Sequence, residues 1–214
     1  MALPFAVLIS GRGSNMLALE RATRDNAIDG RIARVISDRE DAAGLAAARD
    51  LGLATEVVRP EPGEGRESYG RRLAAAVEAG GAGLVVLAGF MRILDGGFVR
   101  AFEDRLLNIH PSLLPAYRGL HTHRRVLEAG DAVHGCTVHF VVEELDAGPA
   151  VIQGRLAVQP GEDESTLSAR VQRIEHIIYP RAVGWFAAGR LACRDGRAWV
   201  DGSKPCPAIL EEID

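Results

Sequence analysis

The stretch VLISGRGSN, from Val7 to Asn15, decides the fold of this chain. It overlaps a continuous apolar run over residues 5–10, which predicts a buried strand. Its glycines are followed by helical spacing over residues 15–26, and a second apolar run over residues 32–37 predicts another strand. Strand, glycine turn, helix and strand make up a βαβ unit, the building block of a parallel sheet.

The same alternation continues along the chain. Further strands are predicted over 55–58, 84–88 and 106–109, and helices over 43–50, 66–79, 97–104 and 122–129, the last with Thr122 as its N-cap.

The pattern changes after this point. Two predicted strands, 136–142 and 151–158, have no helix between them, so we expect them to pair antiparallel. A long helix over 165–189, kinked at Pro180, and a hairpin over 191–200 complete the order. The last dozen residues are Pro-rich and acidic and are predicted to be disordered. The sequence therefore predicts an α/β fold: a Rossmann-like, mostly parallel sheet with helices on both faces and a mixed, antiparallel C-terminal part.

Composition excludes several classes of protein. The chain has 214 residues, 47% apolar and 25% charged, as expected for one globular domain. A formal charge of −4 argues against nucleic-acid binding through phosphate neutralisation. No apolar run approaches the roughly 20 residues of a membrane span, and the N-terminus does not resemble a signal peptide.

Lysine and cysteine usage narrow the choice further. The chain has one lysine, Lys204, far from any glycine loop, which argues against P-loop and pyridoxal enzymes. Its cysteines are three in number and form no C-x-x-C pair, which suits a reducing cytoplasm.

Ligands are expected at the carboxyl ends of the strands, because parallel sheets bind them there. The candidate strand ends are Ser10, Ala88 and Ile109. After the first strand, Gly13-Ser14-Asn15 opens a helix, and backbone N–H groups at such a terminus favour an anion. A capped tight turn remains an alternative. A nicotinamide site is a second alternative, since Asp38 could imitate the ribose-binding acid, but Met16 stands where its fingerprint requires glycine.

The later motifs are also open to two interpretations. The segment 88–94 is either a loop with apolar anchors or an apolar slot for a flat heterocycle. Asn108 and His110 share one strand face, which suits oxyanion stabilisation or proton transfer, although a structural histidine is common there. Asp146 is an ordinary turn aspartate unless it contacts His110.

Two other chemistries find little support in the sequence. Ser112 lacks the G-x-S-x-G context of a hydrolase nucleophile. His121 and His123 have no third ligand at convincing spacing, so no metal is expected. His139 is expected to be structural, or to contact a site residue without contacting the ligand itself.

Taken together, the motifs resemble the folate-dependent phosphoribosylglycinamide formyltransferases over nearly the whole chain. NIHPSLLP alone is typical of the wider formyltransferase superfamily, and its combination with SGRGSN and GLHTH narrows the resemblance. The motifs that carry it are VLISGRGSN (7–15), VVLAGFMRIL (85–94), RLLNIHPSLLP (105–115), GLHTH (119–123), HGCTVHF (134–140) and ELDAGP (144–149).

The resemblance implies transfer of a formyl group from 10-formyltetrahydrofolate to the amine of 5'-phosphoribosylglycinamide, in purine biosynthesis. It implies small-molecule partners, no metal, a cytoplasmic monomer or homodimer, and a single domain over 1–214. Within that domain, about 1–100 would bind nucleotide and phosphate, about 101–200 would carry catalysis and folate, and about 201–214 would be a tail.

Roles also follow from the resemblance. Asp146 would favour the charged imidazole of His110. The implied roles are phosphate binding for Gly13, Ser14 and Asn15; contact with the amine side of the substrate for Glu175; folate binding for Arg66, Met91, Arg92, Ile93, Leu94 and Asn108; and catalysis for Asn108, His110 and Asp146.

Three other functions are alternatives to the one that the resemblance implies. Methionyl-tRNA formyltransferase usually carries an extra C-terminal domain and positive surface, and formyltetrahydrofolate hydrolase usually carries an extra N-terminal domain. A non-catalytic nucleotide-binding module is the alternative outside the enzymes, and the presence of Asn108, His110 and Asp146 argues against it.

Overall fold

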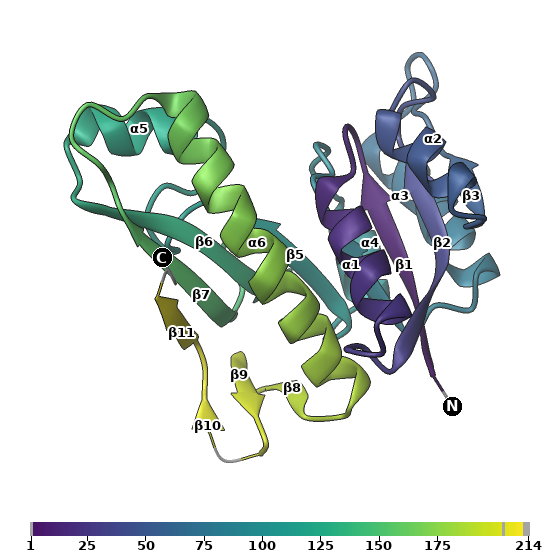
Figure 1. The fold of residues 1–214 in the computed structure, drawn as a ribbon. Coiled ribbons are helices and arrows are strands. Elements are labelled where there is room, and N and C mark those ends of the chain that lie inside the picture. Colours follow the sequence, from purple (N-terminus) through teal and green to yellow (C-terminus); the bar gives the residue numbers. More distant parts are fainter. Residues whose placement is uncertain (1, 203, 212–214) are drawn as a thin grey trace.

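An eight-stranded sheet runs through the computed structural model, which describes residues 2–202 and 204–211 (Figure 1). The strand order is β11-β7-β6-β5-β4-β1-β2-β3, and β6 runs opposite to its neighbours β5 and β7 while the other pairs are parallel. The strands are β1 (Leu3–Ile9), β2 (Gly30–Ser37), β3 (Thr55–Val57), β4 (Leu84–Leu87), β5 (Leu106–His110), β6 (Val133–Phe140), β7 (Ala150–Ala157) and β11 (Ala208–Glu211).

Helices cover both faces of this sheet, because alternate strand residues are apolar on each side. The helices are α1 (Ser14–Arg24), α2 (Ala43–Asp50), α3 (Arg66–Ala79), α4 (Gly96–Ala101), α5 (Thr122–Ala129) and α6 (Glu164–Ala187). One buried cluster joins Val7 and Val86 to α1, α2, α5 and α6. The other joins Leu8 and Val85 to α3 and α4. The predicted α/β class, with helices on both faces, is confirmed.

Strand β5 carries two of the predicted catalytic residues, Asn108 and His110. Leu107 and Ile109 of β5 belong to the α6 side of the core, so Asn108 and His110 point to the opposite face. Polar side chains there face the loops that follow β5 and β6 rather than a helix.

The C-terminal hairpin agrees with the sequence prediction. Strands β8 (Leu191–Arg194) and β9 (Arg197–Val200) pair antiparallel around Asp195 and Gly196, which have φ of 51° and 68°. Positive φ at both central residues gives the turn the twist that a two-residue hairpin requires.

Some predicted boundaries were wrong. Helix α4 ends at Ala101 instead of residue 104, because its C-cap, Phe102, leaves the helical conformation with a φ of −118° and a ψ of 24°. Thr122 is the first helical residue of α5, and the N-cap is His121, with a φ of 59° and no side-chain cap. The long helix continues through Pro180 to Ala187.

The predictions for the late strands and the tail also need correction. Strand β6 begins at Val133 rather than Cys136, because its first residues pair with the end of β7. The tail was predicted to be disordered, but its described part forms β10 (Lys204–Pro205), which pairs with β9, and β11, which pairs with β7. Strand β11 covers an edge of the sheet that would otherwise have unpaired backbone groups.

Candidate active site

The candidate site lies at the carboxyl ends of β1, β4 and β5, where the strand order changes direction. The chain passes from β1 outward to β2 and β3, then returns to place β4 on the other side of β1. Ser10 connects the loops there: its N–H donates to the Gly89 carbonyl (3.1 Å), and its hydroxyl donates to Asp38 Oδ1 (2.6 Å) and accepts from the Met91 N–H (2.8 Å). This is the region that the sequence indicated.

The glycine loop after β1 leaves the first N–H groups of α1 without a side-chain cap. Gly13 has a φ of 73°, and a Cβ there would lie 2.8 Å from Gly44 Cα, so no other residue fits without a shift. The loop therefore presents open backbone donors at a helix N-terminus, which suits a phosphate.

Helix α6 lies against this loop. Asn15 Nδ2 donates to Glu175 Oε2 (2.8 Å), and Gln172 Nε2 donates to Ser14 Oγ (3.0 Å). Burial raises the pKa of Glu175 to about 7, although the bond from Asn15 opposes the shift. Asn15 Oδ1 is buried with no hydrogen-bond partner among the described residues. The structure thus brings together Ser14, Asn15 and Glu175, and adds Gln172, which the sequence analysis did not single out.

His110 lies between two acceptors. Its Nδ1 is 3.4 Å from Asp146 Oδ2, and both side chains are almost fully buried. Its Nε2–H donates to the Tyr117 carbonyl (3.0 Å). A neutral imidazole has one N–H, so only the charged imidazolium can donate to both acceptors. Asp146 therefore contacts His110, which an ordinary turn aspartate would not do.

Asn108 is oriented by a second histidine. His139 Nδ1–H donates to the Phe140 carbonyl (2.8 Å), which leaves His139 Nε2 as the acceptor of an Asn108 Nδ2–H (3.2 Å). Burial lowers the pKa of His139 to about 4, so this ring stays neutral at physiological pH. His139 therefore holds the Asn108 amide, as its expected supporting role requires.

Ser112 takes part in a buried network below the loop that follows His110. Its hydroxyl donates to the Ala116 carbonyl (2.6 Å), and its own carbonyl accepts from Thr137 Oγ1 (2.7 Å). The Ser112 side chain is fully buried, so it shapes the loop and does not act as a nucleophile.

A cavity of about 660 Å³ is lined by four of the residues predicted to bind folate, Arg66, Met91, Arg92 and Ile93, but not by Leu94 or Asn108. Arg92 Nε contacts Asp38 Oδ2 at 2.8 Å, whereas Arg66, at the first position of α3, has no hydrogen-bond or ion-pair partner among the described residues. Met91 and Ile93 are 69% and 61% exposed and supply apolar surface. Leu94 instead packs against the core between the sheet and α3 and α4.

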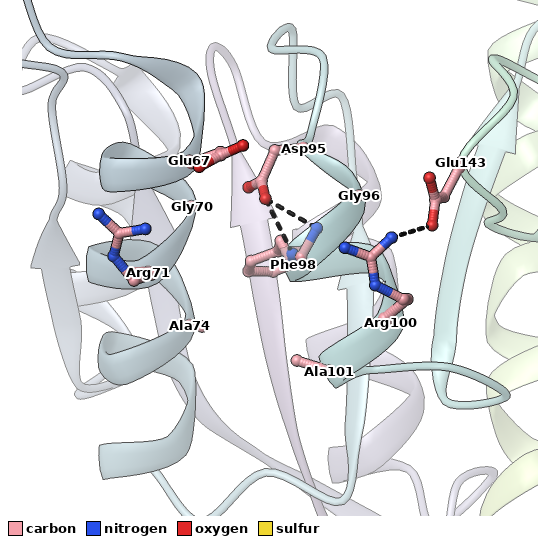
Figure 2. A pocket seen from close by; sticks show the side chains of 11 residues that line it. Glu67, Gly70, Arg71, Ala74, Asp95, Gly96, Phe98, Arg100, Ala101 and Glu143 are labelled. Carbon is pink, nitrogen blue, oxygen red and sulfur yellow. Dashed lines mark hydrogen bonds and ion pairs between the residues drawn. The ribbon is translucent and has the colours of Figure 1, made fainter.

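A second cavity, of about 570 Å³, lies between α3 and α4 and contains no predicted site residue (Figure 2). Asp95 Oδ1 caps α4 by accepting from the N–H groups of Gly97 (2.8 Å) and Phe98 (3.2 Å). Arg100 pairs with Glu143 at its rim, as Figure 2 shows. We assign this cavity no part in the chemistry.

The described residues contain no cluster of three or more His, Cys, Asp or Glu that could hold a metal ion. His123 Nδ1 contacts His134 Nε2 at 3.0 Å instead of pairing with His121. None of the described helices has the length and apolar character to cross a membrane.

Comparison with known proteins identifies the family. A family model described as "Formyl transferase" matches residues 3–183. The chain belongs to this family. It is 49% identical to the phosphoribosylglycinamide formyltransferase of Escherichia coli (strain K12), over 94% of this chain and 95% of that protein. The Haemophilus influenzae enzyme of the same name is 40% identical, over 92% of this chain and 93% of that protein.

A solved structure of phosphoribosylglycinamide formyltransferase from Coxiella burnetii superimposes with a TM-score of 0.92 and 41% identity. The match covers 98% of this chain and all of that one. The family indicated by the motifs, the fold class and the enzyme class, a formyltransferase, are thereby confirmed.

The sequence analysis missed residues that act through the backbone. Tyr117 and Gly119 contact His110 and Asp146 with main-chain groups, and main-chain contacts leave no signal in residue type. Gln172 could have been noticed, because it precedes Glu175 by one helical turn and therefore lies on the same face of α6.

Proposed function

We propose that this site transfers the formyl group of 10-formyltetrahydrofolate to the amine of 5'-phosphoribosylglycinamide, a step of purine biosynthesis. The observation that carries the proposal is His110, held between the Asp146 carboxylate (3.4 Å) and the Tyr117 carbonyl (3.0 Å). This arrangement favours an imidazolium, the form that can stabilise an oxyanion and deliver a proton.

The chemistry needs no metal and no covalent enzyme intermediate. The substrate amine attacks the formyl carbon, and the carbonyl oxygen becomes an oxyanion. Asn108 and His110 donate to that oxygen, which is a stronger acceptor for the Nε2–H than the neutral Tyr117 carbonyl. The C–N10 bond of the folate then breaks, N10 receives a proton, and the former amine loses one.

The two substrates would bind on either side of this centre. Gly13, Ser14 and Asn15 would hold the phosphate through the open N–H groups of α1, and Glu175 would contact the amine side of the ribonucleotide. Folate would bind along the 91–94 segment, because Leu87, the last residue of β4, pairs with Asn108 and places this loop beside the catalytic strand.

The glutamate tail of the folate would lie near Arg66. This guanidinium is at the N-terminus of α3, where the helix dipole does not favour a cation, and it pairs with no carboxylate among the described residues. Both the free charge and the uncapped helix end favour a carboxylate. Arg92 would contribute less, because Asp38 already neutralises it.

We further propose that residues 1–214 act as one domain and work in the cytoplasm, as a monomer or homodimer, on small molecules. Pairing of β4 with β5 joins the two halves in one sheet. The net charge of −4 supports the absence of a nucleic-acid partner.

The test is a formyl-transfer assay with purified protein, 10-formyltetrahydrofolate and phosphoribosylglycinamide, in which tetrahydrofolate release is followed. A rate that requires both substrates is expected. Folate breakdown without the ribonucleotide would instead show a hydrolase, and ribonucleotide binding without turnover would show a non-catalytic module. His110→Ala should lower kcat by about 10²–10³, and near-normal turnover would refute the mechanism.

A further inference from the structure

Residues 117–121, which we call the strap, contact both members of the His110–Asp146 pair. The carbonyl of Tyr117 accepts from His110 Nε2–H (3.0 Å), and the N–H of Gly119 donates to Asp146 Oδ2 (2.9 Å). That same oxygen lies 3.4 Å from His110 Nδ1. The position of the strap therefore sets the position of the histidine and the carboxylate together.

The strap does not hold this shape by local preference alone. Tyr117 and His121 have φ of 56° and 59°, a left-handed conformation that residues other than glycine seldom adopt. Gly119, with a φ of 81°, meets the same requirement without cost. Contacts from outside the strap must therefore keep it in place.

Arg125 of α5 supplies these contacts. One of its guanidinium nitrogens donates to the carbonyls of Arg118 (2.7 Å) and Leu120 (3.3 Å), and the guanidinium lies 5.2 Å from the centre of the Tyr117 ring. The Arg118 carbonyl and the Gly119 N–H belong to one planar peptide and point in opposite directions. By holding that carbonyl, Arg125 directs the N–H toward Asp146.

The other ties of the strap differ in kind. Arg118 pairs with Glu144 at 2.7 Å, but this pair joins two exposed side chains and does not bind the backbone of the strap. Arg125 is exposed as well, but it binds the backbone carbonyls themselves. Tyr117 donates its hydroxyl to Asp131 (2.6 Å), which fixes the far end of the ring rather than the backbone. Arg125 is thus the side chain that grips the peptide next to Asp146.

We propose that Arg125 is a positioning residue for formyl transfer. It fixes the 118–119 peptide, and through it Asp146 and His110, without touching the reacting atoms. The inference rests on the proposed function for its kinetic consequence, but its structural content, the orientation of the His110 ring, can be tested separately.

The experiment compares Arg125→Gln and Arg125→Lys with the matched control Arg124→Gln. Arg124 is the neighbouring residue on α5, but it pairs with Glu164 instead of the strap. We expect Arg125→Gln to lower kcat about 10-fold or more, since small misplacements of catalytic groups are costly. KM for both substrates and Tm should stay near wild type. Arg125→Lys should recover part of kcat, and Arg124→Gln should behave as wild type.

The second readout is NMR of the His110 ring, with ¹⁵N-labelled histidine. The Nδ1 and Nε2 signals should shift in Arg125→Gln and stay in place in Arg124→Gln. Wild-type kcat in Arg125→Gln, or an equal loss in Arg124→Gln, would overturn the inference, as would a loss that follows Tm. If the wild-type chain transfers no formyl group, the proposed function fails alone, and the ring signals still decide for or against the strap contact.

Discussion

At the scale of single residues, Asp146 is positioned to act on the histidine that the proposed mechanism uses. Its Oδ2 accepts from Gly119 and faces His110, and its Oδ1 lies 3.9 Å from His139. A carboxylate attracts a positive charge on a neighbouring ring, whereas a neutral amide does not. Asp146→Asn should therefore lower kcat by about 10²-fold.

The measurement is kcat of Asp146→Asn beside that of Glu144→Gln, which removes an exposed carboxylate from the same loop. Wild-type kcat in Asp146→Asn would show that this carboxylate does not act on His110. A similar loss in Glu144→Gln would assign the effect to the general charge of the loop.

Glu175 provides a prediction about the stability of the protein. Its pKa is raised by burial to about 7, whereas an unfolded glutamate titrates near 4.5. The folded state therefore binds the proton of Glu175 more tightly than the unfolded chain does. The stability that this protonated side chain contributes is complete below about pH 4.5 and is lost as the pH rises to 7. Glu175→Gln should be as stable as wild type at pH 4 and more stable by roughly 3 kcal/mol at pH 8.

Urea unfolding of Glu175→Gln and wild type at both pH values measures this difference, which should be accompanied by weaker binding of the ribonucleotide. Equal stability of the two proteins at pH 8 would contradict the assignment. A gain in stability and a loss of function together would indicate that the buried carboxylate is kept for the substrate.

At the scale of elements, the sequence predicted what depends on local pattern. The runs that became β1 and β4 are uniformly apolar because both faces of these strands are covered, and a glycine follows shortly after each of them. Boundaries that depend on distant partners were missed. Strand β6 is longer than predicted because β7 offers it a partner, and the described part of the tail is ordered by the edges of β7 and β9.

The contact between α3 and α4 gives an element-scale prediction (Figure 2). A Cβ at Gly70 would lie 1.6 Å from Asp95 Oδ2, so the missing side chain makes room for the cap of α4. Alanine is favoured over glycine in a helix by about 1 kcal/mol. Gly70→Ala should nevertheless destabilise the protein by roughly 1–3 kcal/mol, because the carboxylate must move.

A double-mutant cycle isolates this contact. Asp95→Ser keeps an N-cap but shortens the side chain, so Gly70→Ala should become neutral or stabilising in its presence. Denaturant unfolding of the four proteins measures the coupling. Additive effects of the two substitutions would show that the collision does not set the cost.

At the scale of the whole molecule, the site is assembled from segments that are far apart in the chain. The motif residues were recognisable one by one, but the contacts of His110 with Asp146 and of Asn15 with Glu175 are products of the sheet order. Local patterns determine the elements and not how they meet. The candidate residues were therefore predictable, while the strap and the contact of Gln172 on α6 with Ser14 required the structure.

The fold also buries histidines that must stay neutral, and this determines its response to acid. Burial lowers the pKa of His134 and His139 to about 4, and lowers that of His123 and His176 as well. The unfolded chain binds these protons near pH 6.5, so the stability they contribute is complete above that value and is lost as the pH falls toward 4. Glu175 changes the free energy of unfolding in the opposite direction over the same pH range, but its single proton is outweighed by those of the four histidines.

The free energy of unfolding should therefore decrease from pH 6.5 to pH 4.5. Each histidine that stays neutral in the fold contributes at most about 1.4 kcal/mol per pH unit. His134→Gln removes one of these groups along with its contact to His123, so it should lower the stability at neutral pH and flatten the dependence by up to one proton. Urea unfolding at several pH values in this window measures both quantities. A slope identical to that of wild type would mean that His134 titrates alike in the folded and unfolded chains, against the burial that the fold imposes on it.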